Sequence, residues 1–321
     1  TYLFSTFPNP SEDFFHKLRK IIENFLWNNK PPKIKYSVLI NSIEMGGLKL
    51  LDPFSFCNAL KISWVKRILE KTPCKWKTLI DDQLSSVGGN IIWKCNYNTK
   101  DKCLQKISNK FLRNVLEAWC LFKSVFSKTS SSMNPRDIIW NNSYMQIAGS
   151  SFFYKTWFEE GIFEVSHFLD KGGQFLTFDE FRNNFAKLQC NYLDYYSVLH
   201  AIKNAKIFSD RNSNDAVQFV AEKEKVCKAV YPFLVQRSAE SPSKSISKWE
   251  AIFPNRKLNW HSIFSLSFKS TISTKLQYFQ YKFLNHIVYT NTKLFKMKIL
   301  ETTLCSFCKY NEETLSHLFW E

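Results

Sequence analysis

Apolar side chains recur at three- and four-residue spacing in two strongly patterned stretches near the start of the chain. Ser11 precedes the first, which ends near residue 27, and Asp52-Pro53 precedes the second, which continues to about Lys71. Ser and Asp are favoured helix N-caps, and proline is favoured at the first helical position. Both stretches are therefore predicted to be helices, and residues 101–126 show the same period.

The remaining apolar patterns are shorter, with Gly, Pro and Asn between them. Short helices are expected at residues 137–148, 155–169, 177–186, 192–207, 216–235, 249–253, 260–264 and 274–288. A basic Pro-Pro loop is expected at 30–35, loops with one short helix at 74–100, and linkers at 128–135 and 238–247. The expected fold class is mainly α: irregular multi-helical bundles with short extended segments.

Changes in composition suggest five segments, although length alone favours two or three structural units. They are a basic helical segment at 1–72, a helical connector at 73–130, a helical middle domain at 131–237, a basic and aromatic helical segment at 238–304, and a tail at 305–321.

The formal net charge of +16 indicates the class of partner. Residues 1–72 carry 11 basic and 6 acidic side chains and residues 256–321 carry 9 and 4, whereas residues 131–210 carry 7 and 9. Two basic ends flank a near-neutral middle, which favours binding of a polyanion such as RNA or DNA. The alternative is a generic basic surface that keeps the protein soluble.

Nine cysteines, an odd number without a signal peptide, indicate reduced thiols in a nuclear or cytoplasmic setting. No apolar run approaches the length of a membrane span, so the chain is expected to be neither secreted nor in a membrane. Seven cysteines show no close pairing and are expected to be small buried hydrophobic residues. They are Cys57, Cys74, Cys95, Cys103, Cys120, Cys190 and Cys227.

The tail carries the pattern Cys305-x2-Cys308-x8-His317. Two thiolates on one turn and a nearby imidazole supply three of the four ligands of a tetrahedral zinc site. A fourth ligand, a thiolate, is expected about four or five residues beyond His317, where the given sequence ends. We therefore expect the site to be incomplete in this chain. We therefore expect the sequence to be part of a longer chain, with Glu321 or His286 as other possible fourth ligands. The alternative is a chance Cys pair beside a capping or core histidine.

No enzyme active site is visible, and no small-molecule substrate is expected. Asp81-Asp82 follow Leu79-Ile80 rather than the aromatic residue that precedes such a pair in polymerase metal sites, so they are expected to be loop carboxylates. Neither a nucleophile motif nor a Gly-rich phosphate loop is present.

Basic and aromatic residues alternate ahead of the Cys pair. Lys275, Tyr278, Lys282 and Tyr289 are candidate contacts to phosphates and bases, and Lys33, Lys35, Lys66 and Arg67 are further candidate phosphate contacts. Lys61 and Lys71 are also expected on the polar face of the second helix. Leu276, Phe279, Phe283 and Ile287 share one helix face and are expected to be core.

A series of motifs resembles LINE-type, non-LTR retrotransposon reverse transcriptases. FLWNNKPPKIK (25–35), GGLKLLD (46–52) and SWVKR (63–67) are similar to the segment that follows the polymerase core. FYKTWFEEGI (153–162), FLTF (175–178) and YLDYY (192–196) are similar to the middle of that region, and KFLNH (282–286), CSFC (305–308) and ETLSHLF (313–319) to its zinc-binding end. The order of these motifs is more specific than any one of them.

The resemblance implies a thumb-like segment and a helical region that grip template RNA and target DNA, with Cys305, Cys308 and His317 as zinc ligands. The family's fourth ligand, a Cys, has no counterpart, and the polymerase core is absent. We therefore expect a non-catalytic nucleic-acid-binding fragment of undetermined oligomeric state. The alternative is an inert remnant, or a helical protein-interaction module whose basic charge is incidental.

Overall fold

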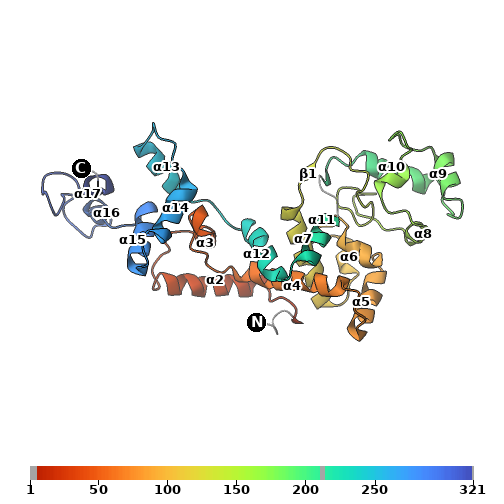
Figure 1. The fold of residues 1–321 in the computed structure, drawn as a ribbon, viewed down its shortest axis with the longest axis horizontal. Helices are drawn as coiled ribbons and strands as arrows, with labels where there is room; N and C mark the ends of the chain where they lie inside the picture. The colour runs from red at the N-terminus through yellow and green to blue at the C-terminus, as the bar shows by residue number, and fades with distance from the viewer. Residues whose placement is uncertain (1–5, 210–213, 320–321) are drawn as a thin grey trace. The chain divides into compact units, whose positions relative to one another are not determined.

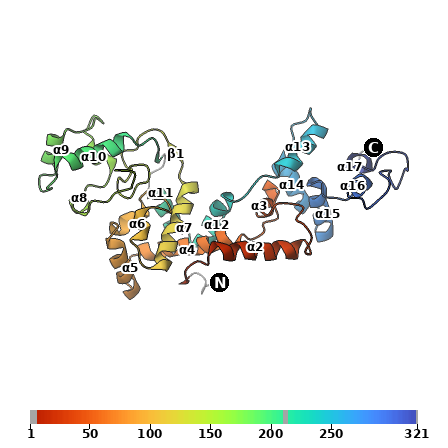
Figure 2. The same ribbon diagram turned by 180° about the vertical axis from the view of Figure 1, so that it is seen from behind.

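The computed structural model describes residues 6–209 and 214–319, which form mainly α-helices (Figures 1 and 2). Helices make up 54% of the chain, and the strands β1 (Thr129–Ser130) and β2 (Phe208–Ser209) pair antiparallel. The expected mainly α fold class is confirmed.

The chain divides into two compact units. The first contains residues 1–18 and 52–237, and the second contains residues 19–51 and 238–321, so the long helix α2 (Glu12–Leu26) contributes to both. The second unit therefore combines segments that are about 200 residues apart. The five segments expected from the sequence are a finer division and stay a prediction.

The first unit is built on three helices, α4 (Pro53–Leu69), α7 (Lys110–Phe126) and α12 (Val226–Gln236), which pack against one another. Its further elements are α5 (Lys75–Ser85), η2 (Gly89–Trp93), α6 (Lys102–Gln105), α8 (Lys155–Glu159), η3 (Val165–Phe168), α9 (Phe178–Asn184), α10 (Tyr192–Lys203) and α11 (Asn214–Glu222). Val65, Trp119 and Val230 are fully buried between the three central helices and belong to one large hydrophobic core.

Side-chain caps explain where the central helices begin. The buried Asp52 carboxylate accepts hydrogen bonds from the backbone N–H of Ser55 at 3.0 Å and from its hydroxyl at 2.6 Å, and Pro53 is the first residue of α4. Asn109 caps α7 in the same way, accepting from the N–H of Leu112 at 3.0 Å. These caps satisfy amides that have no partner inside the helix.

The second unit contains α3 (Tyr36–Leu39), η1 (Ile43–Met45), α13 (Ser243–Ile252), α14 (Trp260–Lys269), α15 (Thr274–Leu284), α16 (Asn291–Lys296) and α17 (Leu315–Phe319). Its small core consists of Ile34, Val38, Leu39 and Tyr281. Tyr281 also donates a hydrogen bond to the carbonyl of Gly46 at 3.4 Å. These contacts pack the 30–50 segment against α15.

Gly46 allows this second core to close. Its φ of +81° is a left-handed conformation that favours glycine, and a Cβ there would lie 2.7 Å from the Pro242 ring and 3.0 Å from Phe264. The turn after η1 can therefore approach both α14 and the start of α13 only because residue 46 has no side chain.

Several helix predictions are confirmed, including those at residues 11–27, 52–71, 177–186 and 274–288. Others are interrupted: 101–126 contains α6 and α7, 155–169 contains α8 and η3, and 216–235 is covered by α11 and α12. The linker expected at 238–247 is shorter, because α13 already begins at Ser243.

The helix expected at 137–148 is wrong. Ile138 forms a bridge with Glu164, and the Trp140 indole donates to the carbonyl of Ile162 at 2.7 Å. The side-chain amides of Asn141 and Asn142 bind the carbonyls of Val87 and Ile138. Asparagine side chains that bind backbone groups favour turns over helix, and the backbone groups here pair with a distant segment.

Within the described residues, none of the helices combines the length and the apolar content that crossing a bilayer requires.

Candidate metal centre and basic surface

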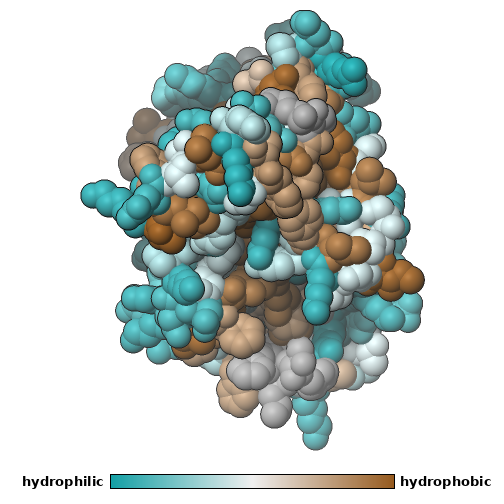
Figure 3. Space-filling view, turned by 90° about the vertical axis from the view of Figure 1, so that its left-hand side faces the viewer, coloured by the Kyte–Doolittle hydropathy of each residue, from teal (hydrophilic) through white to brown (hydrophobic). Residues whose placement is uncertain are grey.

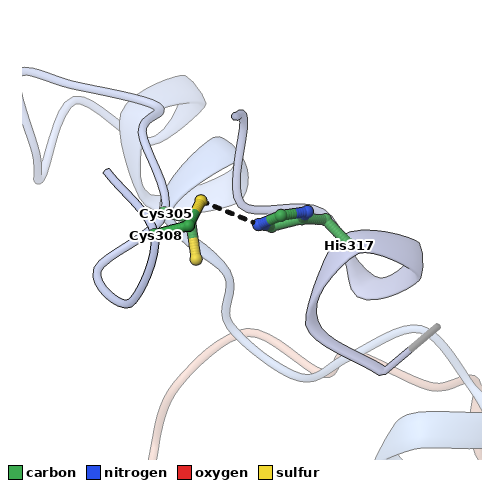
Figure 4. Close-up of side chains that lie close together, drawn as sticks. All are labelled: Cys305, Cys308 and His317. Carbon is green, nitrogen blue, oxygen red and sulfur yellow. Dashed lines mark hydrogen bonds between the residues drawn. The ribbon is translucent and has the colours of Figure 1, made fainter. Parts of the chain in front are cut away.

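Cys305, Cys308 and His317 converge at the end of the second unit (Figure 4). Their ligand atoms all lie within 4.8 Å of one another, and Cys308 Sγ is 3.2 Å from His317 Nε2. Among the residues that the structure describes, this is the one cluster of three or more such side chains that could hold a metal ion.

Local hydrogen bonds position the three side chains. The N–H of Cys305 donates to the carbonyl of Asn311 at 2.8 Å, and the N–H of Lys309 donates to the carbonyl of Cys305 at 2.9 Å, which closes the turn that carries both cysteines. Lys309 has a φ of +63° at the end of this turn. His317 lies on α17, and its N–H binds the Thr314 hydroxyl at 3.1 Å.

Glu313 connects this turn to α16. One oxygen of its buried carboxylate accepts from the N–H of Ser306 and the other from the N–H of Asn291, both at 3.0 Å. The Thr292 hydroxyl donates to the Glu313 carbonyl at 2.7 Å. The sequence alone did not identify this role of Glu313, because nothing in the motif distinguishes Glu313 from the neighbouring Glu312.

The three side chains fit a zinc ion. Thiolates and imidazole are the ligands that zinc prefers, and a sulfur and a nitrogen bound to one tetrahedral zinc are about 3.5 Å apart, close to the Cys308–His317 separation. Amides of Asn311 and Tyr310 lower the pKa of Cys308 to about 7, which favours the thiolate that a metal requires. Cys305 is 2% exposed, so one ligand is already withdrawn from water.

Two fourth ligands were considered from the sequence, and one of them can be placed in the structure. Glu321 lies outside the described residues. His286 packs its ring on Trp249, with centroids 4.5 Å apart, and is not part of the cluster.

The structure brings four of the predicted contact residues together in pairs in the second unit. Lys33 Nζ lies 3.9 Å from the centre of the Tyr289 ring, and Lys282 Nζ lies 4.1 Å from the centre of the Tyr278 ring. Both rings are about half exposed, Tyr278 by 47% and Tyr289 by 48%. Lys275 is exposed in the first turn of α15. The pairing of Lys33 with Tyr289 joins residues that are more than 240 positions apart.

The other predicted contacts have internal partners. Lys35 forms an exposed ion pair with Glu240 at 2.8 Å. In the first unit, Lys66 donates to the carbonyl of Lys223 at 2.9 Å, and the Arg67 guanidinium lies 4.8 Å from the Trp64 ring. The expectation that Lys61 lies on the polar face of α4 is wrong, because this side chain is 1% exposed.

The expected core face of α15 is also partly wrong. Leu276 and Phe279 are exposed, by 54% and 42%, whereas Tyr281 on another face is the buried ring of the helix. Phe283 is half-buried between Trp249 and Phe319, with centroid distances of 5.2 and 4.8 Å. The face of α15 that carries Tyr281 is buried because it packs against the segment 34–39 in the small second core. Helical periodicity alone cannot predict which face packs in this way.

Two lysines that the sequence did not single out, Lys248 and Lys293, add positive charge beside His286 in the second unit. Burial, Lys248 and Lys293 lower the pKa of His286 to about 4, and hydrogen bonding to Lys33 lowers the pKa of Tyr289, with Lys30 and Lys282 adding to the effect. Among the described residues, the charged groups named here as shifting these two pKa values are all lysines. The second unit as a whole is also basic, because residues 19–51 and 238–321 contain 17 basic and 8 acidic side chains.

Asp81 and Asp82 are exposed neighbours on α5 rather than loop carboxylates. The seven unassigned cysteines are not uniformly buried: Cys95 and Cys103 are buried, Cys74 is exposed, and the rest are intermediate. All nine cysteines lie in the described part of the chain and are free thiols.

Comparison with known families supports the assignment of the C-terminal region. Residues 244–321 match the family described as zinc-binding in reverse transcriptase. This match covers α13 to α17 and includes Cys305, Cys308 and His317. The C-terminal region is thus related to reverse transcriptases. A comparison with curated proteins finds no match.

Proposed function

We propose that this chain is a nucleic-acid-binding, non-catalytic C-terminal region of a LINE-type, non-LTR retrotransposon reverse transcriptase. In this role it positions template RNA and target DNA for a polymerase domain that lies elsewhere. The observation that carries the proposal is the three-ligand cluster at residues 305–317 inside a region that matches a reverse-transcriptase zinc-binding family.

Zinc is the proposed metal, held by the Cys305 and Cys308 thiolates and by His317 Nε2. A bound zinc ion supplies folding energy to the tail and no redox chemistry. The protein's own residues do the rest: the Glu313 carboxylate holds the cysteine turn beside α16, which keeps the tail close to the basic surface of the second unit.

The basic surface supports RNA and DNA as partners. Lysines that lack carboxylate partners repel one another, and a polyanion relieves this repulsion while releasing its own counterions. The half-exposed Tyr278 and Tyr289 rings offer flat faces for bases beside the lysine ammonium groups.

Salt dependence tests the proposal. We expect the full chain to bind labelled RNA and DNA with little sequence preference, and log affinity to fall linearly with log salt. Charge reversal of Lys33 and Lys282 in one variant, and of Lys66 and Arg67 in another, should each weaken binding. Each variant should also flatten the slope by about one unit for every phosphate that it no longer binds.

Reversal of exposed Lys155, which pairs with Glu159 in the near-neutral middle segment, serves as the control. Binding that does not respond to salt, or to either double variant, would instead favour the protein-interaction module.

A further inference from the structure

The start of α13 forms one wall of a pocket of about 210 Å³ within the second unit. Residues of the segment 33–38 and Asn285, which follows α15, also line this pocket. Three lysines line the pocket: Lys33, Lys35 and Lys244. Serines 241, 243 and 245 line it too, and the Ser245 hydroxyl donates to the Asn285 side-chain oxygen at 3.4 Å.

One carboxylate lines this pocket, and it is already engaged. Glu240 is bonded to Lys35 at 2.8 Å, and this pair together with Ser37 lowers the pKa of the Glu240 carboxyl. Two hydrogen bonds also hold the backbone of Glu240. Its N–H donates to the Ser37 carbonyl at 3.0 Å, and its carbonyl accepts from the side-chain amide of Asn41 at 2.6 Å. Neither Lys33 nor Lys244 pairs with a carboxylate of the described residues. The hydrogen bond from Lys33 to Tyr289 leaves the lysine charge uncompensated, so both ammonium groups can attract a bound anion.

The lining groups are hydrogen-bond donors suited to phosphate. Lysine ammonium groups and serine hydroxyls are common phosphate contacts in nucleic-acid complexes. The N-terminal end of α13 has no side-chain cap, and the positive end of its helix dipole adds to the favourable field at the same wall.

Lys33 joins the pocket to an exposed ring. Lys33 lines the cavity, and its Nζ lies 3.9 Å from the centre of the Tyr289 ring. Because the ammonium covers one face of this ring, a phosphate in the pocket would contact Lys33 and the adjacent base would stack on the opposite face of Tyr289. Figure 3 shows hydrophilic and hydrophobic residues interspersed over one face of the molecule.

We propose that this pocket and Tyr289 form a binding site for single-stranded nucleic acid, in which the pocket takes a backbone phosphate and the ring stacks on the adjacent base. This inference rests on the proposed nucleic-acid-binding function and adds a specific location and a strand preference. A duplex would present its phosphates to the lysines, but its paired and stacked bases could not reach the ring.

Fluorescence anisotropy with the full chain tests the site, using a mixed-sequence labelled oligonucleotide as single-stranded RNA, as single-stranded DNA and as DNA duplex. Tyr289→Ala should weaken single-strand binding about tenfold and leave duplex binding nearly unchanged, whereas Tyr289→Phe, which keeps the ring, should bind like the unmodified chain. Lys244→Ala should reduce the salt slope by about one unit. The matched control is Lys269→Ala, an exposed lysine on α14 that does not line the pocket.

The outcomes separate the site from the function. If the unmodified chain binds neither strand form with salt dependence, both the proposed function and this site fail. If it binds, but Tyr289→Ala has equal effects on single strands and duplex, or Lys244→Ala matches Lys269→Ala, the function stands and the site is overturned. Circular dichroism of each variant checks that the helices are retained.

Discussion

Lys123 is a heavily buried cation that binds the backbone directly. Its side chain is 6% exposed, and its ammonium donates to the carbonyls of Cys95 at 2.8 Å and Lys94 at 3.1 Å. Burial lowers its pKa from 10.5 to about 8, with Cys95 and Cys120 acting in the opposite direction. Lys123 therefore satisfies two backbone carbonyls that follow η2. Burial of its positive charge nevertheless raises the free energy of the native state.

The pH dependence of stability follows from this shift. Between about pH 8 and pH 10.5 the unfolded chain keeps a proton that the native Lys123 has lost, so the Lys123 contribution to the free energy of unfolding rises with pH in this window. Relative to Lys123→Met, the unmodified chain should gain up to about 1.4 kcal/mol per pH unit there. Urea unfolding of both proteins at about pH 7 and about pH 10 measures this difference.

The control is Lys128→Met, a change at a nearby exposed lysine. The Lys128 ammonium is in water in both the native and the unfolded state, so this variant should not change the pH dependence of stability. A constant difference between Lys123→Met and the unmodified chain across this pH range would show that Lys123 is not desolvated as the structure indicates.

The zinc ligands and the basic surface differ in how far the sequence could predict them. Cys305, Cys308 and His317 lie within 13 positions, so spacing alone suggested that they converge. Lys33 and Tyr289 meet only because the small core around Tyr281 brings segments 34–39 and 274–284 together. A single sequence without distance information does not contain that pairing, and Lys244 and Lys293 were missed for the same reason.

Among the helices, α4 illustrates what local sequence predicts well. Its beginning depends on Asp52 and Pro53, the predicted end was near Lys71, and the observed helix is Pro53–Leu69. Residues 137–148 show the opposite case, because buried Ile138, Ile139 and Trp140 pair with the 162–164 segment instead of forming a helix. Helical periodicity does not predict such long-range backbone pairing.

The Asp52 cap provides a test at this scale. Asp52→Ala removes the acceptor for both the N–H and the hydroxyl of Ser55 in a buried position, so we expect a loss of about 2 kcal/mol in the free energy of unfolding. Asp52→Asn keeps one side-chain oxygen and should lose less. Denaturant unfolding followed by far-UV circular dichroism gives these values.

Asp81→Ala on exposed α5 removes a carboxylate with no cap role and should change stability by no more than about 0.5 kcal/mol. Equal losses for Asp52→Ala and Asp81→Ala would contradict the importance of the cap.

For the molecule as a whole, the division into two units means that a ligand of one unit need not stabilise the other. The first unit has the large core around α4, α7 and α12, whereas the buried hydrophobic cluster described in the second contains only four residues. A unit with so small a core depends more on other sources of stability, such as a bound metal.

Zinc removal should therefore act on the second unit alone. In hydrogen–deuterium exchange, chelation should increase exchange at residues 303–319, and at Asn291 and Thr292, whose amides bind Glu313, while leaving α4 and α7 unchanged. Cys308→Ser should exchange in the same way even with zinc present, because it removes one of three ligands. Cys74→Ser, a change at an exposed cysteine of the first unit, should keep the zinc response. Identical exchange of the tail with and without zinc would show that Cys305, Cys308 and His317 do not hold a structural metal and that hydrogen bonds through Glu313 suffice.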